Sequence, residues 1–391
     1  MAQLIIYSSM EQGSPVLTGE VGKLVALLDA CLVNGYAGTV VSITRVGTVA
    51  TVTTTNQHCF HIGNTITIAG ANEVDYNIAA VVTAIPTAVT FTYTVAGAPA
   101  TPATGAITWT KPGAGWTKPY TGANKAAFLQ GAGSNSNLIR VQDDAPATAK
   151  EARVVGYETM SDVDTGTNIY PTAAQLANGM FARKSFSADA TARSWLVVAD
   201  ARTFYVFIKT GDQSGAATTY CAFGFGEFYS LQAGDTYRQF IIARTTENSA
   251  AIALENLDKL ATVITSTIDG CYVDRGHNGT GDPVRCERKG DVAKSNNALK
   301  LTGNIAYTNP QNGAFYLSRV FITDKTTTPI NNLRGRLRGF WHFLHPFASV
   351  ANLEEVTGTG ELAGKKFMYI LPGGSSSTIY TIETTSTVET N

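Results

Sequence analysis

Three carboxylates lie close together in the segment YETMSDVDTG, which spans residues 157–166. Glu158, Asp162 and Asp164 would supply the acid and the base of glycoside hydrolysis, which is the chemistry of a polysaccharide depolymerase. Asp beside Thr and Gly is also what a tight turn requires. Because no substrate-gripping aromatic platform is assigned nearby, we interpret the segment as a turn and assign no catalytic residue.

The H-C-x-H cluster of His58, Cys59 and His61 has side chains of the types that bind zinc. A structural zinc site normally needs four ligands. No nearby spacing supplies the fourth, so the pattern favours a packed turn over a metal site.

A glycine-rich segment at residues 271–291 has side chains that could wrap a calcium ion. These side chains are Asp274, His277, Asp282 and Asp291. Calcium loops need a dense run of oxygen ligands that ends in a bidentate acid, and Glu287 does not stand at that position. We predict a long exposed loop here, and we expect neither a metal ion nor another cofactor.

The segment RGRLRGFWHFLHPF, residues 334–347, combines arginines with aromatic residues. Arg and Trp are enriched where interfaces concentrate their binding energy. The sequence therefore predicts a subunit contact formed by Arg334, Arg336, Arg338, Phe340, Trp341 and Phe343. A buried strand with flanking arginines explains the pattern equally well.

Composition excludes several classes of function. The 29 Lys and Arg nearly balance the 30 Asp and Glu, so there is no basic surface for nucleic acid or an anionic membrane. Apolar runs such as WLVVA, residues 195–199, are far shorter than the roughly 20 residues that span a bilayer. The first residues do not follow the pattern of a secretory signal, so we expect the chain to fold in the cytoplasm where it is made.

Most of the chain is predicted to form strands, because Thr, Gly and alternating aromatic residues dominate it. Residues 194–212 predict a hairpin, and residues 220–245 continue it as a meander. Helical spacing occurs only at residues 21–32, 172–179 and 248–263. The expected fold class is mainly β, with few short helices.

Residues 39–110 differ from their surroundings and predict a small all-β module, sandwich-like or barrel-like, inserted into a host domain. The charged residues of this segment are Arg45, Glu73 and Asp75. Apolar and polar residues alternate along its strands, so one face of each strand can be buried while the other carries threonine. The host domain then consists of residues 1–38 and 111–391, and the pattern allows a sub-boundary near 325–335.

The inserted segment resembles the FCCH-type β module, first named in ubiquitin-activating enzymes, which recurs as an insertion in tailed-phage structural proteins. The likeness rests on TVTTTNQHCFHIGNTITIAGANEVDYNIAAVVTAIPTAVTFTYTV, residues 51–95. Within it, the matching positions are His58, Gly63 with Asn64 in place of the usual acid, Tyr76-Asn77 and Phe91-Thr92-Tyr93. In the phage proteins such modules are passive surface decorations.

The host segments resemble a family of tailed-bacteriophage virion structural proteins. The likeness rests on DACLVNGY (29–36), GWTK (115–118), ARVVGYETMSDVDTGT (152–167), RSWLVVADARTFY (193–205) and FGFGEFYSL (223–231). It implies a non-enzymatic virion component that assembles with copies of itself and with other virion proteins. It implies no catalytic residues.

Tail or neck is the first expectation for the place in the particle, and capsid decoration is the alternative. The neutral, Thr-rich module could touch host-surface glycans weakly. A different class of function stays open, namely a carbohydrate-binding or depolymerising tail protein that uses Glu158, Asp162 and Asp164.

Overall fold

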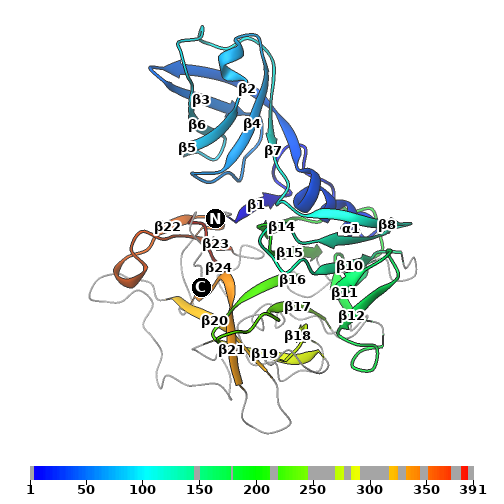
Figure 1. Cartoon of the computed structure of the whole chain (residues 1–391). Coiled ribbons are helices and arrows are strands. Elements are labelled where there is room, and N and C mark those ends of the chain that lie inside the picture. Colours follow the sequence, from blue (N-terminus) through cyan, green and yellow to red (C-terminus); the bar gives the residue numbers. More distant parts are fainter. Residues whose placement is uncertain are drawn as a thin grey trace.

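Antiparallel strands build almost the whole protein, which confirms the predicted β-rich fold class. A computed structural model describes residues 4–144, 150–177, 179–211, 219–244, 269–276, 283–290, 317–324, 332–343, 351–370 and 380–385. Two parts are evident: a small barrel and the larger host sheet from which it projects (Figure 1). Among the described residues, no helix combines the length and apolarity needed to cross a membrane.

The inserted segment is a closed six-stranded barrel with the strand order β2-β3-β6-β5-β4-β7. Its elements are β2 (Tyr36–Val46), β3 (Val49–Thr54), β4 (Thr65–Ala71), the 3-10 turn η2 (Val74–Tyr76), β5 (Ala79–Thr87), β6 (Thr90–Thr94) and β7 (Gly105–Lys111). The predicted limits, 39 and 110, fall inside the first and last strands. Because β2 and β7 pair from Tyr36↔Lys111 onward, the chain enters and leaves the barrel through neighbouring strands.

The host strands belong to one continuous sheet. Its first strands are β1 (Ile5–Ser8), β8 (Thr117–Gly122), β9 (Lys125–Leu129), β10 (Leu138–Gln142), β11 (Glu151–Met160), β12 (Gly166–Tyr170), β13 (Met180–Arg183), β14 (Trp195–Ala199), β15 (Thr203–Gly211), β16 (Thr219–Ser230) and β17 (Gln239–Arg244). The others are β18 (Asp269–Val273), β19 (Val284–Gly290), β20 (Leu317–Asp324), β21 (Asn332–Phe343), β22 (Glu355–Thr357), β23 (Lys366–Ile370) and β24 (Tyr380–Glu383), with the 3-10 turn η4 at Gly360–Leu362.

The meander predicted from residues 194–245 is confirmed as β14 to β17, paired in sequence order. From β17 the pairing continues through β18, β19, β20 and β21, and β21 pairs back with β16. These six strands therefore close a ring within the host sheet. The allowed sub-boundary near 325–335 begins after β20 and includes the start of β21, and the sheet continues across it because these strands pair with each other.

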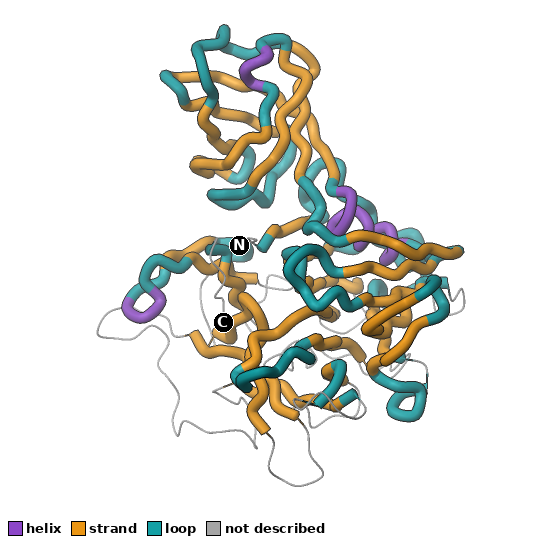
Figure 2. The backbone as a smooth tube through the Cα atoms, viewed as in Figure 1, coloured by secondary structure: helices purple, strands orange, loops and turns teal. Residues whose placement is uncertain are grey.

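The helix predicted at residues 21–32 forms as α1 (Lys23–Leu28), which runs on as a π-helical segment, η1 (Asp29–Asn34). It lies where the barrel joins the host sheet (Figure 2). Its apolar residues face the core at helical spacing; the buried ones are Leu24, Leu27, Leu28, Cys31 and Leu32. Gly35 ends the segment with a φ of 71°, and an added Cβ would lie 2.0 Å from the Lys111 carbonyl oxygen.

The helix predicted at residues 172–179 is wrong. The chain makes only one turn here, closed by the hydrogen bond from Leu176 N–H to Thr172 O, and a glycine at φ 68° follows it. One turn is too short to repay helix nucleation. The helix predicted at residues 248–263 lies outside the described residues.

The apolar core is continuous between the barrel and the host sheet. One buried cluster contains Phe91 and Trp109 from the barrel, Tyr36 at its entry and Leu28 from α1. The barrel is therefore packed onto the host sheet rather than joined to it by linkers alone.

Candidate functional site at the base of the barrel

The Glu11 carboxylate, just after β1, lies at the point where the barrel meets the host sheet. Its Oε1 accepts hydrogen bonds from Lys111 Nζ at the end of β7 and from Cys59 N at 2.9 Å. Its Oε2 accepts from the Tyr36 hydroxyl at the start of β2 and from Ser8 N at 3.0 Å. One host side chain thus binds the first strand, the last strand and a loop of the barrel.

Lys111 is the cation that balances Glu11, and both side chains are almost fully buried. Its ammonium also donates to the Ile6 carbonyl oxygen at 2.7 Å. It lies 4.9 Å from the Phe60 ring centroid and 5.4 Å from that of Tyr7. A buried ammonium is tolerated only with such partners, because burial removes its hydration.

The groups around this pair are unsuited to nucleophilic or acid–base catalysis near neutral pH. Burial, followed by the negative charge of Glu11, raises the pKa of Cys59 to about 12. Burial also raises the pKa of Tyr7 and of Tyr36 well above the usual value for tyrosine. A protonated thiol and protonated phenols leave the cluster with a positional role, so we call Glu11, Lys111, Tyr36 and Cys59 the base clamp.

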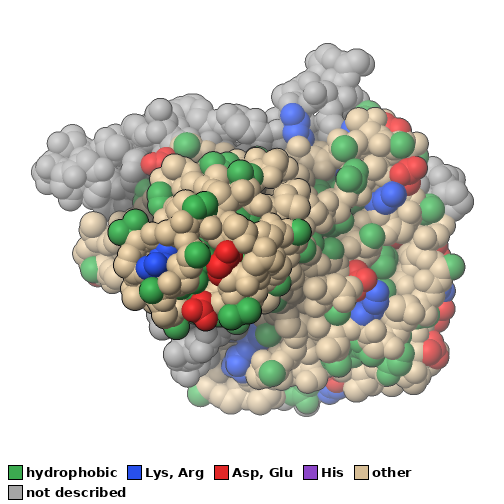
Figure 3. Space-filling view, turned by 90° about the horizontal axis from the view of Figure 1, so that it is seen from above, with side chains coloured by type: hydrophobic (Ala, Val, Ile, Leu, Met, Phe, Trp, Pro, Cys, Tyr) green, Lys and Arg blue, Asp and Glu red, His purple; other side chains and the backbone are tan. Residues whose placement is uncertain are grey.

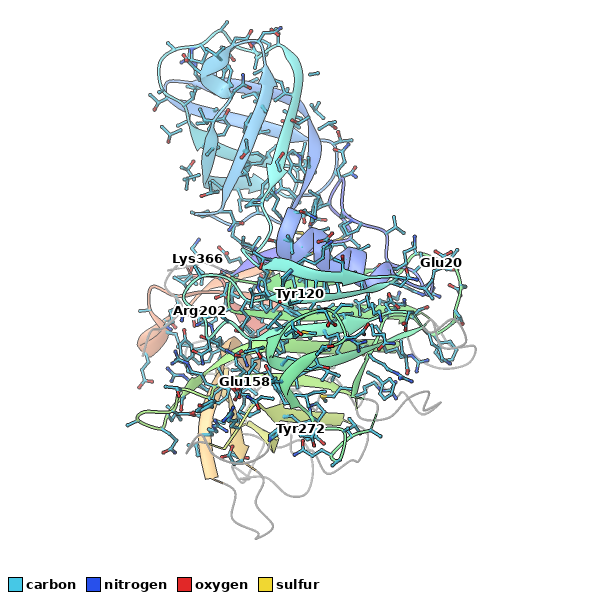
Figure 4. The ribbon with its side chains drawn as sticks, turned by 45° about the vertical axis from the view of Figure 1, so that its right-hand side comes forward. Glu20, Tyr120, Glu158, Arg202, Tyr272 and Lys366 are labelled. Carbon is cyan, nitrogen blue, oxygen red and sulfur yellow. The ribbon has the colours of Figure 1, made fainter. Side chains whose placement is uncertain are left out.

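A second contact holds the barrel to the C-terminal strands. His61 Nδ1 lies 3.2 Å from Glu355 Oε2 on β22, and Glu355 also bonds Lys366 Nζ at 2.9 Å and the Thr384 hydroxyl at 3.0 Å. Burial opposes ionisation of Glu355, but hydrogen bonds from His61 and Lys366 outweigh it and bring its pKa to about 2. Figure 4 shows Lys366 beneath the barrel.

The H-C-x-H cluster does not converge on one point. His58 stacks on Phe60 with ring centroids 4.9 Å apart, Cys59 packs with Leu4 and Ile6 of the host, and His61 contacts Glu355. Among the described residues, no group of three or more His, Cys, Asp or Glu side chains is placed to hold a metal ion. The packed-turn interpretation describes these residues.

Replacing His58 with phenylalanine is expected to make the folding stability less sensitive to acid. Burial, the largest influence, lowers the pKa of His58 from 6.5 to about 4. Between these two pH values the unfolded chain binds a proton here while the folded chain does not. The folded state therefore loses stability as the pH falls through this window, by up to ~3 kcal/mol.

Urea unfolding at pH 6.5 and pH 4.5 measures this loss for the wild type and the variant, above the range in which Glu355 loses its contribution. Glu355→Gln is the matched control, because a carboxyl with its pKa lowered from 4.5 to about 2 loses its contribution only below pH 4.5. An equal loss between pH 6.5 and pH 4.5 in wild type and His58→Phe would contradict the assignment.

The three carboxylates of residues 157–166 are occupied by structural contacts. Glu158 accepts two hydrogen bonds from Arg275, at 2.5 and 2.7 Å. Asp164 accepts from Lys125 at 2.6 Å and from Arg140 at 2.5 Å, and these bonds lower its pKa.

Asp162 caps the turn by accepting from Asp164 N at 2.7 Å, and this bond is the main cause of its lowered pKa. The pKa values of Asp162 and Asp164 are thus shifted away from what a general acid needs. Glu158 lies on the host sheet, away from the barrel (Figure 4). The geometry favours the turn interpretation.

The calcium candidates are only partly within the described residues. His277, Asp282 and Asp291 lie outside them. Asp274 is buried and accepts from Arg275 N at 3.0 Å and Gln239 N at 3.3 Å. Burial raises the pKa of this carboxyl to about 8.

The arginine and aromatic run forms β21, which pairs with β16, β20 and β24. Arg334 is fully buried and binds both oxygens of Asp235, at 3.0 and 3.1 Å. Arg338 binds Asp200 at 2.7 Å.

The aromatic residues of the run are likewise internal. Phe340 packs against Tyr205, and the Trp341 indole N–H donates to Glu383 at 3.2 Å. Arg334, Arg338, Phe340 and Trp341 are buried within the chain, which is the arrangement that the buried-strand alternative predicts. Arg336 is half-buried, and the Phe343 side chain lies outside the described residues.

Sequence reasoning missed Glu11, Lys111 and Glu355. Glu11 and Lys111 are 100 positions apart, and no local pattern connects them. The one available signal was the position of Lys111 at the end of an otherwise almost uncharged segment. No protein-family model and no curated protein matches the chain.

Proposed function

We propose that the chain is a non-enzymatic structural component of a tailed-phage virion. It assembles in multiple copies with itself and with other virion proteins, in the tail or neck, and its barrel is an accessory that faces outward. Capsid decoration is the alternative position. The proposal rests on the motif resemblance of the host segments together with the geometry of the chain.

The observation that carries the non-enzymatic part is the engagement of the candidate catalytic carboxylates. Glu158 and Asp164 are held by cations, and Asp162 is used to close a turn. An enzyme that hydrolyses glycosides needs one protonated and one free carboxyl group around the sugar. The rival depolymerase function therefore has no support from these contacts.

The observation that favours a mechanical role is the fixed attachment of the barrel. The base clamp and the His61–Glu355 contact hold it at two places, and its core continues into that of the host sheet. A module attached in this way keeps one orientation, which a repeating assembly requires of every copy.

The double variant Asp162→Asn with Asp164→Asn distinguishes the structural role from the depolymerase function. We expect wild type and variant alike to leave host surface polysaccharide intact, measured as released reducing ends. We also expect the chain in purified particles at a copy number that matches a symmetry axis, measured by quantitative mass spectrometry. Polysaccharide turnover that the variant abolishes, together with absence of the chain from particles, would overturn the proposal.

A further inference from the structure

Two of the five cysteines stand directly opposite each other across a pair of strands in the host sheet. β18 and β19 pair with the register Cys271↔Cys286, which continues without a shift to Val273↔Val284. Directly opposed positions of an antiparallel pair lie on the same face of the sheet, whereas a slip of one residue would put them on opposite faces. The register therefore brings two cysteine positions together.

The separation of opposed strand positions suits a disulfide. In an antiparallel pair, the Cα atoms of directly opposed residues are about 4.5 or 5.5 Å apart, depending on whether hydrogen bonds join the two residues. A disulfide spans Cα–Cα distances of about 4.4–6.8 Å. The bond can thus form across β18 and β19 without a large movement of either backbone.

Neighbouring strands hold both cysteines in place. β17 pairs with β18, with Ile242 opposite Cys271, and β20 pairs with β19, with Asp324 opposite Cys286. Cys271 is fully buried, and its apolar cluster includes Ile242 and Val273. Two thiols positioned in this way have a high effective concentration for each other.

The other three cysteines are placed differently. Cys31 belongs to the helical segment η1, and Cys59 lies in the barrel between β3 and β4. Cys221 lies on β16, opposite an isoleucine of β15. β18 and β19 lie at the end of the host sheet away from the barrel (Figure 1), and the barrel is nearest the viewer in Figure 3. Among the described strand pairs, β18 with β19 is the one that opposes two cysteines.

We propose that Cys271 and Cys286 form a cross-strand disulfide when the chain meets oxidising conditions. A small disulfide such as glutathione disulfide is the oxidant. The thiolate of one cysteine attacks a glutathione sulfur, which forms a mixed disulfide and releases one glutathione thiolate. The thiolate of the other cysteine then attacks the mixed disulfide and releases the second glutathione thiolate. Two cysteine thiols are oxidised, and their two protons and two electrons end on two glutathione molecules.

The bond would make the stability of the host sheet depend on its surroundings. Cellular thiols keep cysteines reduced in a cytoplasm, so the bond forms only outside such conditions. It closes a loop of about 15 residues, which corresponds to a decrease of about a hundredfold in the unfolding equilibrium constant. Because Cys271 is buried, the oxidant reaches it while the chain folds or when the hairpin opens. The inference goes beyond the proposed function and does not depend on it.

Peptide mapping of the whole chain tests the pairing. The chain is refolded from urea in reduced and oxidised glutathione, and separately with a phosphine reductant, and the remaining thiols are then alkylated. Trypsin releases residues 260–275 and 286–288, each with one cysteine. After oxidising refolding we expect these two peptides to be joined, with two hydrogen atoms fewer than the separate thiol peptides. Alkylation of both peptides after oxidising refolding, or a link from either one to a different cysteine, would overturn the inference.

Urea unfolding of two variants measures the effect of the bond. Cys286→Ala removes one partner, and Cys221→Ala is the matched control, because Cys221 is also a cysteine on a host strand. Each protein is compared with itself under oxidising and reducing conditions, so the cost of the substitution cancels.

We expect oxidation to lower the unfolding equilibrium constant about a hundredfold in wild type and in Cys221→Ala, and to leave it unchanged in Cys286→Ala. An equal effect of oxidation in Cys286→Ala, or none in wild type, would contradict the pairing. If Cys286→Ala does not fold, the peptide map of wild type still decides. Neither measurement involves particles, so a negative result here leaves the proposed function standing.

Discussion

Glu11→Leu should destabilise the protein by about 3–5 kcal/mol, because it leaves the Lys111 ammonium buried without its carboxylate. The same change removes the acceptor of Cys59 N and of the Tyr36 hydroxyl. Urea unfolding followed by tryptophan fluorescence measures the loss, since Trp109 lies in the barrel core.

The ion pair at Glu20 and Lys23 provides the control. Its atoms are 3.7 Å apart and both side chains are largely exposed, so Lys23→Met is expected to change stability by less than about 1 kcal/mol. The double variant Glu11→Leu with Lys111→Met should be more stable than Glu11→Leu alone, because no charge is then left buried. A cost for Glu11→Leu no larger than that for Lys23→Met would show that the base clamp does not hold the barrel.

Arg334→Met is expected to cost a similar amount, about 3–5 kcal/mol, because Asp235 would keep a buried negative charge without the guanidinium that binds both its oxygens. Arg334 Nη1 lies 3.3 Å from Asp324 Oδ1, in addition to its two bonds with Asp235. Thermal unfolding of the isolated chain measures the effect.

Arg336→Met is the matched control, since Arg336 lies two positions away on the same strand and is half-buried. It should cost less than about 1 kcal/mol, as partly exposed charges generally do. If Arg334 were instead a subunit contact, Arg334→Met would leave the isolated chain as stable as wild type and would weaken only its assembly. That result would restore the interface prediction.

Local pattern was sufficient for several elements of this fold. Alternation in residues 194–245 predicted the β14–β17 meander, and apolar spacing predicted α1, because each depends on residues close in sequence. The change in composition between residues 39 and 110 marked the barrel for the same reason. The turn at Thr172 was wrongly predicted as a helix, because a short helical pattern does not show whether tertiary contacts will stabilise a helix there.

The contacts that fix the barrel could not be read in this way. Glu11, His61 and Glu355 are ordinary polar residues in their own segments, and their partners are brought to them by the folding of distant strands. The arginines of β21 show a different limit of sequence reasoning, because their local pattern is clear but fits two structures. Arg beside aromatics has the same composition at an interface and in an internal ion-pair network, and only the positions of Asp200 and Asp235 distinguish the two.

The pairing of Tyr36 with Lys111 also affects how the two parts can be recombined. The Cα atoms of directly opposed residues in an antiparallel pair are about 5 Å apart, so a foreign unit with adjacent termini could be grafted between these positions without stretching the host. Such a graft would keep Glu11 and Lys111 but would lose the backbone amide of Cys59 and the ring of Phe60 that shield them. A grafted unit must therefore supply its own groups to shield the Glu11–Lys111 ion pair from water.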